Sequence, residues 1–385
     1  MSKTYAVLGA GMQGTAAAYD LAKFGDAAKI KMGDVSLEQA NKSAWRVNDL
    51  VGSAVCGPHQ VNALDPANLG AFLADVDVLL SCVPYWMHPK IAKVAIETKT
   101  SMVDLGGNTE VTMETLAMDE MAKSAGVTLV PDTGLAPGLV NSIGMYLIES
   151  MDSCDKVNLY CGVLPQNPKP PFNYKLTFNV EGLVTEYDFQ AVALRDGQIC
   201  LIDTLTELED LTIDQLGPME AFVTSGGTST APYTLQGRVA NYEYKTIRFP
   251  GHCERIKIFK DFGFWNPNEI EVDGKQVVPR HLFYKVFGEA LEAFVDDDLC
   301  AVRGVGVGTK NGEPCRLQVD IFDKQCKRTG FTSMERLTGF SCAIYAIDIA
   351  TGGMPAGCLR YENGMPGTRF LAELQKREDV NLKFS

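Results

Sequence analysis

The feature that most constrains the fold is a set of three glycines near the start of the chain, Gly9-x-Gly11-x-x-Gly14. The apolar residues 4–8 before them have the composition of a buried strand. Residues 12–24 after them place apolar side chains at helical spacing. A glycine turn between a buried strand and a helix is typical of the first turn of a parallel α/β sheet that binds a dinucleotide.

Each glycine has a separate physical task in such a turn. Gly9 permits the tight turn, Gly11 lets the backbone approach the pyrophosphate, and Gly14 lets the helix pack closely on the sheet. The free N–H groups and the helix dipole then hold the phosphates, so we expect Met12 and Gln13 to line the same site.

Asp34 follows the second predicted strand, residues 28–32, and lies 20 residues beyond Gly14. A carboxylate at this place accepts hydrogen bonds from the ribose hydroxyls and repels a 2′-phosphate. The sequence therefore favours NAD over NADP as the cofactor.

Strand and helix patterns alternate as far as residue 131, which predicts a doubly wound parallel sheet, an NAD-binding Rossmann domain over residues 1–131. The nicotinamide of a dinucleotide lies over the carboxyl ends of the later strands, here residues 77–83 and 101–105. The cofactor-binding residues expected there are Cys82, Val83, Pro84, Gly106 and Asn108, with Tyr85 near the substrate.

After Pro131 the pattern changes to short runs of period two separated by Pro and Gly, including residues 157–161 and 174–180. These predict a second, α+β domain with a mostly antiparallel sheet over residues 132–345, which binds substrate, carries catalysis and forms oligomers. Residues 346–385 are expected to return to the Rossmann domain.

Composition excludes several classes of partner and site. The net charge of −13 argues against binding to nucleic acid or an anionic membrane surface. No apolar stretch approaches the ~20 residues of a membrane-spanning helix, and no secretory signal is visible, so we expect a cytoplasmic protein. The 11 cysteines form no C-x-x-C pair and accompany only 4 histidines, so no metal site is expected.

Longer motifs extend the glycine turn into a family resemblance that covers essentially the whole chain. The chain resembles the saccharopine dehydrogenase superfamily and, within it, the lysine 6-dehydrogenase branch. The segments that carry the resemblance are DTGLAPG (132–138), GVLPQNPKPPFNYK (162–175), Glu181-Gly182 with Glu186-Tyr187, TLTELE (204–209), AFVTSGGTSTAPY (221–233), YKTIRFPGHCE (244–254) and SMER (333–336). Phe249 departs from the Tyr expected in that branch.

The resemblance implies NAD-dependent oxidative deamination of the ε-amino group of L-lysine, a step of lysine degradation. The product is allysine, which cyclises to Δ1-piperideine-6-carboxylate, and ammonia is released. It also implies a homodimer or a larger homo-oligomer.

Amine oxidation needs a general base, because only a free amine lone pair can assist the departure of hydride from its carbon. Three residues are candidates for this catalytic role: Asp132 after a strand end, His252 after a Pro-Gly turn, and Lys175 if desolvation lowered its pKa. Asp132 and His252 are equally consistent with structural roles in turns, and the sequence does not order the three.

The remaining substrate-binding candidates match the charged head group of an amino acid. Arg248 can hold a carboxylate with two parallel hydrogen bonds, and Glu186 can hold an ammonium group. Tyr174 and the hydroxyl-rich loop of Thr228 complete the predicted set.

Two other functions remain open on the same fold. The chain can be a saccharopine reductase-like or carboxynorspermidine synthase-like oxidoreductase that acts on a secondary amine, because the glycines and DTGLAPG serve equally there. It can also be a cofactor-binding regulatory protein without catalysis.

Overall fold

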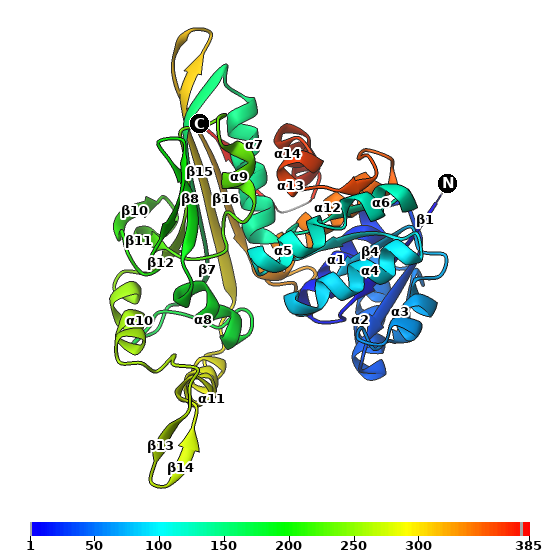
Figure 1. Ribbon diagram of the computed structural model, residues 1–385, viewed down its shortest axis with the longest axis horizontal. Helices are drawn as coiled ribbons and strands as arrows, with labels where there is room; N and C mark the ends of the chain where they lie inside the picture. The colour runs from blue at the N-terminus through cyan, green and yellow to red at the C-terminus, as the bar shows by residue number, and fades with distance from the viewer. Residues whose placement is uncertain (1, 378–379) are drawn as a thin grey trace. The chain divides into compact units, whose positions relative to one another are not determined.

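The computed structural model describes residues 2–377 and 380–385 of the chain. Contacts within the chain divide it into two compact units, and each unit is assembled from separate stretches of sequence (Figure 1). Unit 1 consists of Met1–Ser150, Ser229–Thr234 and Cys326–Val380, and unit 2 of Met151–Thr228, Leu235–Gln325 and Asn381–Ser385.

Unit 1 contains a parallel sheet of seven strands in the described residues, in the order β17-β6-β5-β4-β1-β2-β3. Its strands are β1 (Lys3–Leu8), β2 (Ala27–Asp34), β3 (Cys56–Gln60), β4 (Val78–Ser81), β5 (Ser101–Asp104), β6 (Thr128–Val130) and β17 (Gly357–Cys358). Strand order reverses beside β1, which is where a doubly wound sheet binds its ligand. The predicted Rossmann architecture is confirmed.

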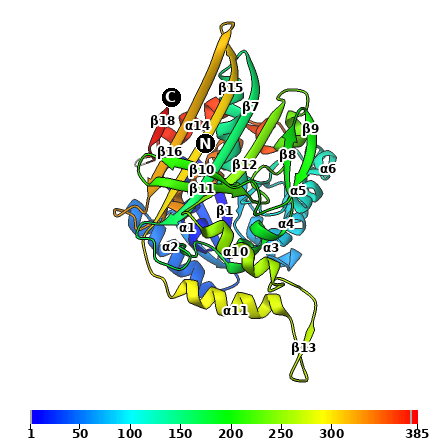
Figure 2. The same ribbon diagram turned by 90° about the vertical axis from the view of Figure 1, so that its left-hand side faces the viewer.

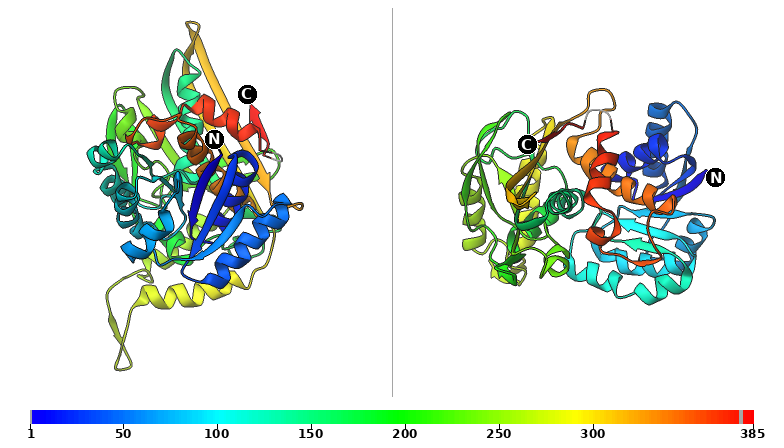
Figure 3. Two further views of the ribbon diagram at one scale, coloured as in Figure 1. Left: turned by 90° about the vertical axis from the view of Figure 1, so that its right-hand side faces the viewer. Right: turned by 90° about the horizontal axis from the view of Figure 1, so that it is seen from above.

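Helices cover both faces of this sheet (Figure 3). They are α1 (Met12–Phe24), α2 (Leu37–Val51), α3 (Pro66–Leu73), α4 (His88–Glu97), α5 (Thr109–Leu116), α6 (Asp119–Ala125), α7 (Val140–Glu149), α12 (Ser333–Ala350), α13 (Tyr361–Gly364), α14 (Gly367–Gln375) and most of α9 (Ala231–Leu235). A 3₁₀ turn, η1 (Tyr85–Met87), precedes α4, and a π-helical turn, η2 (Leu135–Leu139), precedes α7.

Helix α12 explains why the units differ from the predicted domains. It is buried along nearly its whole length, and an apolar helix of this kind must lie inside a core. It packs on α1, where a Cβ at Gly339 would lie 2.7 Å from the backbone nitrogen of Ala17. The return to unit 1 therefore begins at Cys326 instead of residue 346, and unit 1 also keeps α7 beyond the predicted boundary at 131.

Unit 2 is built on a mixed sheet, and its strands are β7 (Ser153–Pro165), β8 (Ala191–Arg195), β9 (Gln198–Ile202), β10 (Glu209–Ile213), β11 (Gly217–Val223), β12 (Asn241–Arg248), β15 (Asp298–Lys310), β16 (Glu313–Lys324) and β18 (Leu382–Phe384). The pair β12–β7 is parallel, and the other pairs between these strands are antiparallel. The predicted, mostly antiparallel second sheet is confirmed.

Side chains alternate between the two faces of each strand of this sheet. On what we name the inner face, Phe222 joins an aromatic core with α8 (Val180–Asp188), α10 (His252–Asp261) and α11 (Pro279–Glu292). On the outer face, Ala221 and Ile247 belong to a separate apolar core beneath β10. Figure 2 shows β10 and β11 crossing the long strands, and a hairpin of β13 (Ile270–Val272) and β14 (Lys275–Val277) beyond α11.

One local prediction was wrong. Residues 174–180 do not form a strand, because Tyr174 turns into the aromatic core and Val180 begins α8. Residues 109–125 form two short helices, α5 and α6, and the break between them follows Leu116. Over the described residues, the structure contains no helix of the length and apolarity that would span a membrane.

Candidate functional site

The glycine turn forms the predicted junction between β1 and α1 in unit 1. A Cβ at Gly14 would lie 2.0 Å from the carbonyl oxygen of Gly9, so only glycine permits this approach of helix to turn. A Cβ at Gly11 would meet no atom within 4 Å, which leaves open space beside the backbone that is expected to face the pyrophosphate. Met12 and Gln13 begin the helix at this point, with Met12 exposed.

Asp34 ends β2, and hydrogen bonds fix its half-buried side chain. Oδ2 accepts from the backbone N–H of Ala10 at 2.9 Å, and Oδ1 accepts from that of Ser36 at 2.9 Å. The carboxylate is therefore held against the glycine turn, and each oxygen keeps a further lone pair for a ribose hydroxyl. The four residues after it, Val35 to Glu38, bring no positive charge that could hold a 2′-phosphate.

The other cofactor candidates follow neighbouring strands of the same sheet. Cys82, Val83 and Pro84 come directly after β4, and Gly106 comes after β5. Asn108 caps α5, since its side chain accepts the backbone N–H of Val111. Tyr85 packs on the loop of Gly106 and Asn108, since a Cβ built on Gly107 would lie 3.1 Å from the Cβ of Tyr85.

Asp132 follows β6 and is 1% exposed. Its carboxylate accepts a hydrogen bond from the Ser229 hydroxyl. Burial, and next the charge of Asp104, raise the pKa of Asp132 to about 7 against the opposing hydrogen bonds of Ser229 and Thr112. A carboxyl with this pKa exchanges protons near neutral pH, which a general acid or base requires.

The backbone of Asp132 and that of Ser229 are both strained. Asp132 has φ +66° and Ser229 has φ +43°, in the left-handed region that non-glycine residues seldom adopt. Strained backbone concentrates at functional sites, where the surrounding structure holds it in place. Ser229 was not among the predicted site residues, although it lies in the SGGTST loop that the sequence had singled out. Its neighbour Thr228, which was predicted to bind substrate, donates its hydroxyl to the backbone carbonyl of Val192 at 2.7 Å.

In unit 2, a second cluster forms on the inner face around Arg248, the last residue of β12. The guanidinium is 4% exposed and lies 5.0 Å from the ring centroid of Tyr174. Its Nε donates to the Tyr187 hydroxyl at 3.0 Å, and Nη1 donates to the carbonyl of Ile247. Its Nη2 lies 3.6 Å from Oε2 of Glu186. Burial opposes its charge, but Tyr187, Tyr174 and Glu186 together raise its pKa further above the usual value.

Glu186 is the carboxylate of this cluster. Its side chain keeps 36% of its surface exposed, and the remainder packs in the cluster, where burial raises its pKa to about 7. Arg248 opposes this shift without cancelling it. The cluster therefore offers a positive group and a partly protonated negative group, which match the two charges of an amino-acid head group.

His252 begins α10 in the same cluster, and buried Glu220 fixes the turn before it. The two carboxylate oxygens of Glu220 accept the N–H groups of Gly251 at 2.7 Å and Cys253 at 2.6 Å. Nε2 of His252 lies 3.1 Å from the Tyr187 hydroxyl, and Nδ1 lies 3.4 Å from the carbonyl of Phe172. Because the hydroxyl accepts from Arg248, its proton goes to Nε2, and Nδ1 carries the imidazole proton.

This environment bears on His252 as a candidate base. Burial and the charge of Arg248 lower its pKa to about 3. The imidazole is therefore neutral at physiological pH and binds a proton weakly, which suits a hydrogen-bonding role better than a proton acceptor. Lys175 follows Tyr174 in the sequence and acts on Asp296, whose pKa is lowered against burial mainly by hydrogen bonds from Asn167 and Asp297 and least by the charge of Lys175. Of the three base candidates, Asp132 has the environment that fits the task.

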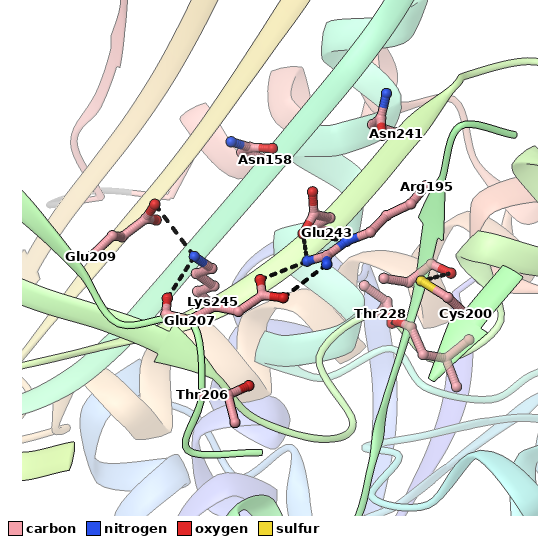
Figure 4. A network of polar contacts seen from close by, with 12 residues as sticks. Asn158, Arg195, Cys200, Thr206, Glu207, Glu209, Thr228, Asn241, Glu243 and Lys245 are labelled. Atoms are coloured by element: carbon pink, nitrogen blue, oxygen red, sulfur yellow. Dashed lines mark hydrogen bonds and ion pairs between the residues drawn. The ribbon is translucent and has the colours of Figure 1, made fainter. Parts of the chain in front are cut away.

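The outer face of unit 2 holds a different polar cluster around a cavity of about 210 Å³ (Figure 4). Arg195 donates two hydrogen bonds to Glu207, of 2.8 and 2.6 Å, and its Nε donates to Glu243 at 3.1 Å. Nζ of Lys245 lies 3.3 Å from Oε2 of Glu209 and donates to the carbonyl of Glu207. Both cations are thus neutralised by carboxylates of the protein.

Comparison with known proteins identifies the family. The family model of the saccharopine dehydrogenase NADP binding domain matches residues 5–130. The family model of the saccharopine dehydrogenase C-terminal domain matches residues 134–379. The chain belongs to the saccharopine dehydrogenase family. Residues 5–130 match a domain of this family described as NADP binding, and the predicted family is confirmed at this level.

Curated relatives share part of the chain. A saccharopine dehydrogenase (NADP⁺, L-glutamate-forming) of Pyricularia oryzae is 27% identical over 221 residues, which cover 55% of this chain and 48% of the relative. An alpha-aminoadipic semialdehyde synthase of Arabidopsis thaliana is 30% identical over 57% of this chain and 22% of the relative. The chain thus spans about half or less of the curated relatives it matches.

Solved structures confirm the fold. A saccharopine dehydrogenase (L-Glu forming) from Saccharomyces cerevisiae has a TM-score of 0.79 at 19% identity, covering 100% of this chain and 99% of that one. A homospermidine synthase from Legionella pneumophila, solved with NAD, has a TM-score of 0.66 at 13% identity, covering 100% and 92%.

Proposed function

We propose that the protein catalyses NAD-dependent oxidative deamination of the ε-amino group of L-lysine. The observation that carries the proposal is the pair formed by buried Arg248 and half-exposed Glu186 in a wall of tyrosines. Arg248 would hold the α-carboxylate and Glu186 the α-ammonium. Among the described residues of this cluster Arg248 is the one buried arginine, since Arg255 near His252 is exposed, and one such group suits the one carboxylate of lysine better than the three of saccharopine.

Unit 1 supplies the other half of the chemistry. The open space at Gly11 and the fixed carboxylate of Asp34 fit NAD, which would accept hydride when bound. We propose NAD over NADP because Asp34 would repel a 2′-phosphate and none of the four residues after it is a cation.

Asp132 is the proposed base of the reaction. Its ionised form takes the proton of the ε-ammonium and leaves a free amine, whose lone pair assists hydride departure from the ε-carbon. The protonated carboxyl then returns its proton as water adds to the imine and ammonia leaves. In sum, lysine, NAD⁺ and water give allysine, NADH and ammonium with release of one proton. Allysine loses water when it cyclises to Δ1-piperideine-6-carboxylate.

The purified full chain should reduce NAD⁺ with L-lysine and release one ammonia for each NADH, with the cyclic imine detected by mass spectrometry. Saccharopine and cadaverine are the comparison substrates. Glutamate release from saccharopine, without ammonia from lysine, would replace the proposal with the secondary-amine alternative, which the names of the curated relatives favour. Tight NAD binding without turnover of any amine would favour the regulatory alternative.

The cofactor preference has its own test. We expect Asp34→Ala to raise KM for NAD about tenfold and to narrow the preference over NADP, because one charge-assisted contact to the ribose is lost. Glu38→Ala, an exposed acid on the next helix, is the matched control. Unchanged kinetics with both cofactors would refute the role of Asp34.

Homodimer formation is also part of the proposal, as the family resemblance implies. Light scattering of the purified chain at several concentrations tests it, and a mass of one 41.9 kDa chain throughout would exclude it.

A further inference from the structure

Asp104, the last residue of β5, connects two loops of unit 1. The side chain is 2% exposed, and its Oδ1 accepts the backbone N–H of Gly106 at 2.9 Å and of Asp132 at 3.0 Å. Its own carbonyl accepts both the N–H and the hydroxyl of Thr133, at 2.8 and 2.7 Å. One residue therefore ties the predicted nicotinamide loop to the loop of Asp132.

The two loops meet with no spare room. A Cβ at Gly106 would lie 2.3 Å from Oδ1 of Asp132, and the φ of Gly106 is +77°. The Asp132 carboxyl thus lies directly on the backbone of the loop that Asp104 holds. A displacement of Asp104 would move both the carboxyl and the loop.

His88 covers the other side of Asp104. The imidazole is 2% exposed, with Nδ1 at 3.1 Å from the Ser81 hydroxyl and Nε2 at 4.0 Å from Oδ1 of Asp104. The Asp104 carboxylate would repel a lone pair on Nε2, so Nε2 carries the imidazole proton. Nδ1 then accepts a hydrogen bond from the Ser81 hydroxyl. Burial lowers the pKa of His88, and Asp104 opposes this shift. A neutral imidazole leaves the negative charge of Asp104 uncompensated.

The remaining ionisable neighbours do not supply that compensation. Burial and the charge of Asp104 raise the pKa of the Cys82 thiol to about 12, and burial likewise raises the pKa of Cys342, so both thiols stay neutral. Glu362 of α13 is a second carboxyl that acts on Asp132 in the same direction as Asp104, and more weakly. The hydrogen bonds of Ser229 and Thr112 act in the opposite direction.

We propose that Asp104 is a positioning residue for Asp132: its hydrogen bonds fix the two loops together and hold the Asp132 carboxyl against the backbone of Gly106. The like charge of Asp104 also opposes ionisation of Asp132. This inference goes beyond the proposed function. It rests on that function in one respect, the assignment of Asp132 as the base. Asp104 touches neither substrate nor cofactor in this scheme. It acts through the carboxyl next to it.

Asp104→Asn separates the two effects, because the amide oxygen can accept both backbone N–H groups while the charge is gone. The first readout is the titration of Asp132 in the full chain, followed by ¹³C NMR of labelled aspartate carboxyls and assigned with Asp132→Asn. We expect the midpoint to move down by about one pH unit, as for other closely spaced carboxyl pairs. A midpoint that does not move in the folded variant overturns the proposal.

Ser229→Ala is the matched control, because it removes a hydrogen bond to the ionised form and should move the midpoint upward. If Asp104→Asn does not fold, Asp104→Ser takes its place, because a hydroxyl also removes the charge while it keeps a hydrogen-bond acceptor. The Asp132 midpoint should again fall, and no fall there would equally refute the proposal.

The second readout is the pH profile of kcat/KM with lysine. The acidic limb of Asp104→Asn should begin at lower pH than that of the wild type, by the same shift as the NMR midpoint. A shifted NMR midpoint in a protein that does not oxidise lysine would leave the role of Asp104 intact and refute the proposed function. Lysine oxidation with an acidic limb that does not move would refute the role of Asp104 and leave the proposed function intact.

Discussion

Two arginines of unit 2 both act to lower the pKa of the carboxylate beside them, but the net outcome differs. Arg195 contacts Glu207 through two hydrogen bonds, and the pKa of Glu207 is lowered, first by these bonds and further by the charges of Arg195 and Lys245. Arg248 lies 3.6 Å from Glu186, whose pKa burial raises to about 7. The side chains of Glu207 and Glu186 are equally exposed, so the difference lies in their contacts. Glu207 accepts two hydrogen bonds from its arginine, whereas Glu186 is 3.6 Å from the nearest guanidinium nitrogen of Arg248.

The two clusters share strand β12. Glu243 and Lys245 point to the outer face, and Arg248 points to the inner face with the tyrosines (Figure 4). The outer cluster binds its own charges together and so stabilises the fold. The inner cluster keeps charge and hydrogen-bonding capacity in reserve for a ligand. The comparison indicates that the distance between opposite charges, more than the number of charges, distinguishes a structural network from a cluster that can bind a ligand.

The largest effect expected from this comparison is on turnover. Arg248→Met should lower kcat/KM for lysine about 100-fold, because truncating a buried, hydrogen-bonded charge costs several kcal/mol. Steady-state kinetics should show a much smaller loss with cadaverine, which has no carboxylate, and Arg195→Met should stay within about twofold of the wild type. Equal losses with both substrates would break the assignment of Arg248 as a carboxylate clamp.

The second effect is on the pH dependence of KM. Glu186 binds an ammonium when ionised, and its raised pKa means that it ionises as pH rises through about 7. KM for lysine should therefore fall between pH 6 and pH 8. In Glu186→Gln it should stay flat, and above pH 7 it should be about tenfold higher than in the wild type, the equivalent of one charge-assisted hydrogen bond. Glu243→Gln is the control on the outer face, and a flat wild-type profile would contradict the role given to Glu186.

The smallest effect is on stability, and it falls on the outer cluster. Arg195→Met should lower the free energy of unfolding by about 1 kcal/mol, because its side chain is 34% exposed and solvent screens its ion pairs. Urea unfolding measures this loss, and added salt should narrow the gap to the wild type. A loss that is insensitive to salt would mean that packing, not charge, holds the cluster together.

Local patterns were sufficient for most of unit 1. The glycine turn, the position of Asp34 and helix α1 agree with their sequence patterns, because a strand, a glycine turn and a helix each leave a signal in a short window of sequence. The region of residues 172–188 was predicted less well. Tyr174 and Tyr187 are placed by the aromatic core of unit 2, and contacts made far along the chain override local preference there.

Glycine spacing and residue chemistry predicted the dinucleotide fold, the family and the candidates Asp132, Arg248, Glu186 and His252, because both are local properties of the sequence. The environments of these candidates differ only after folding. Burial raises the pKa of Asp132 and lowers that of His252, and so separates two candidates that the sequence had left equal. Folding also brings Ser229 and Asp104 into contact with Asp132, from 97 and 28 residues away in the sequence. Proton affinity depends on solvent exclusion and on charges brought together by folding, and neither is encoded in a local pattern.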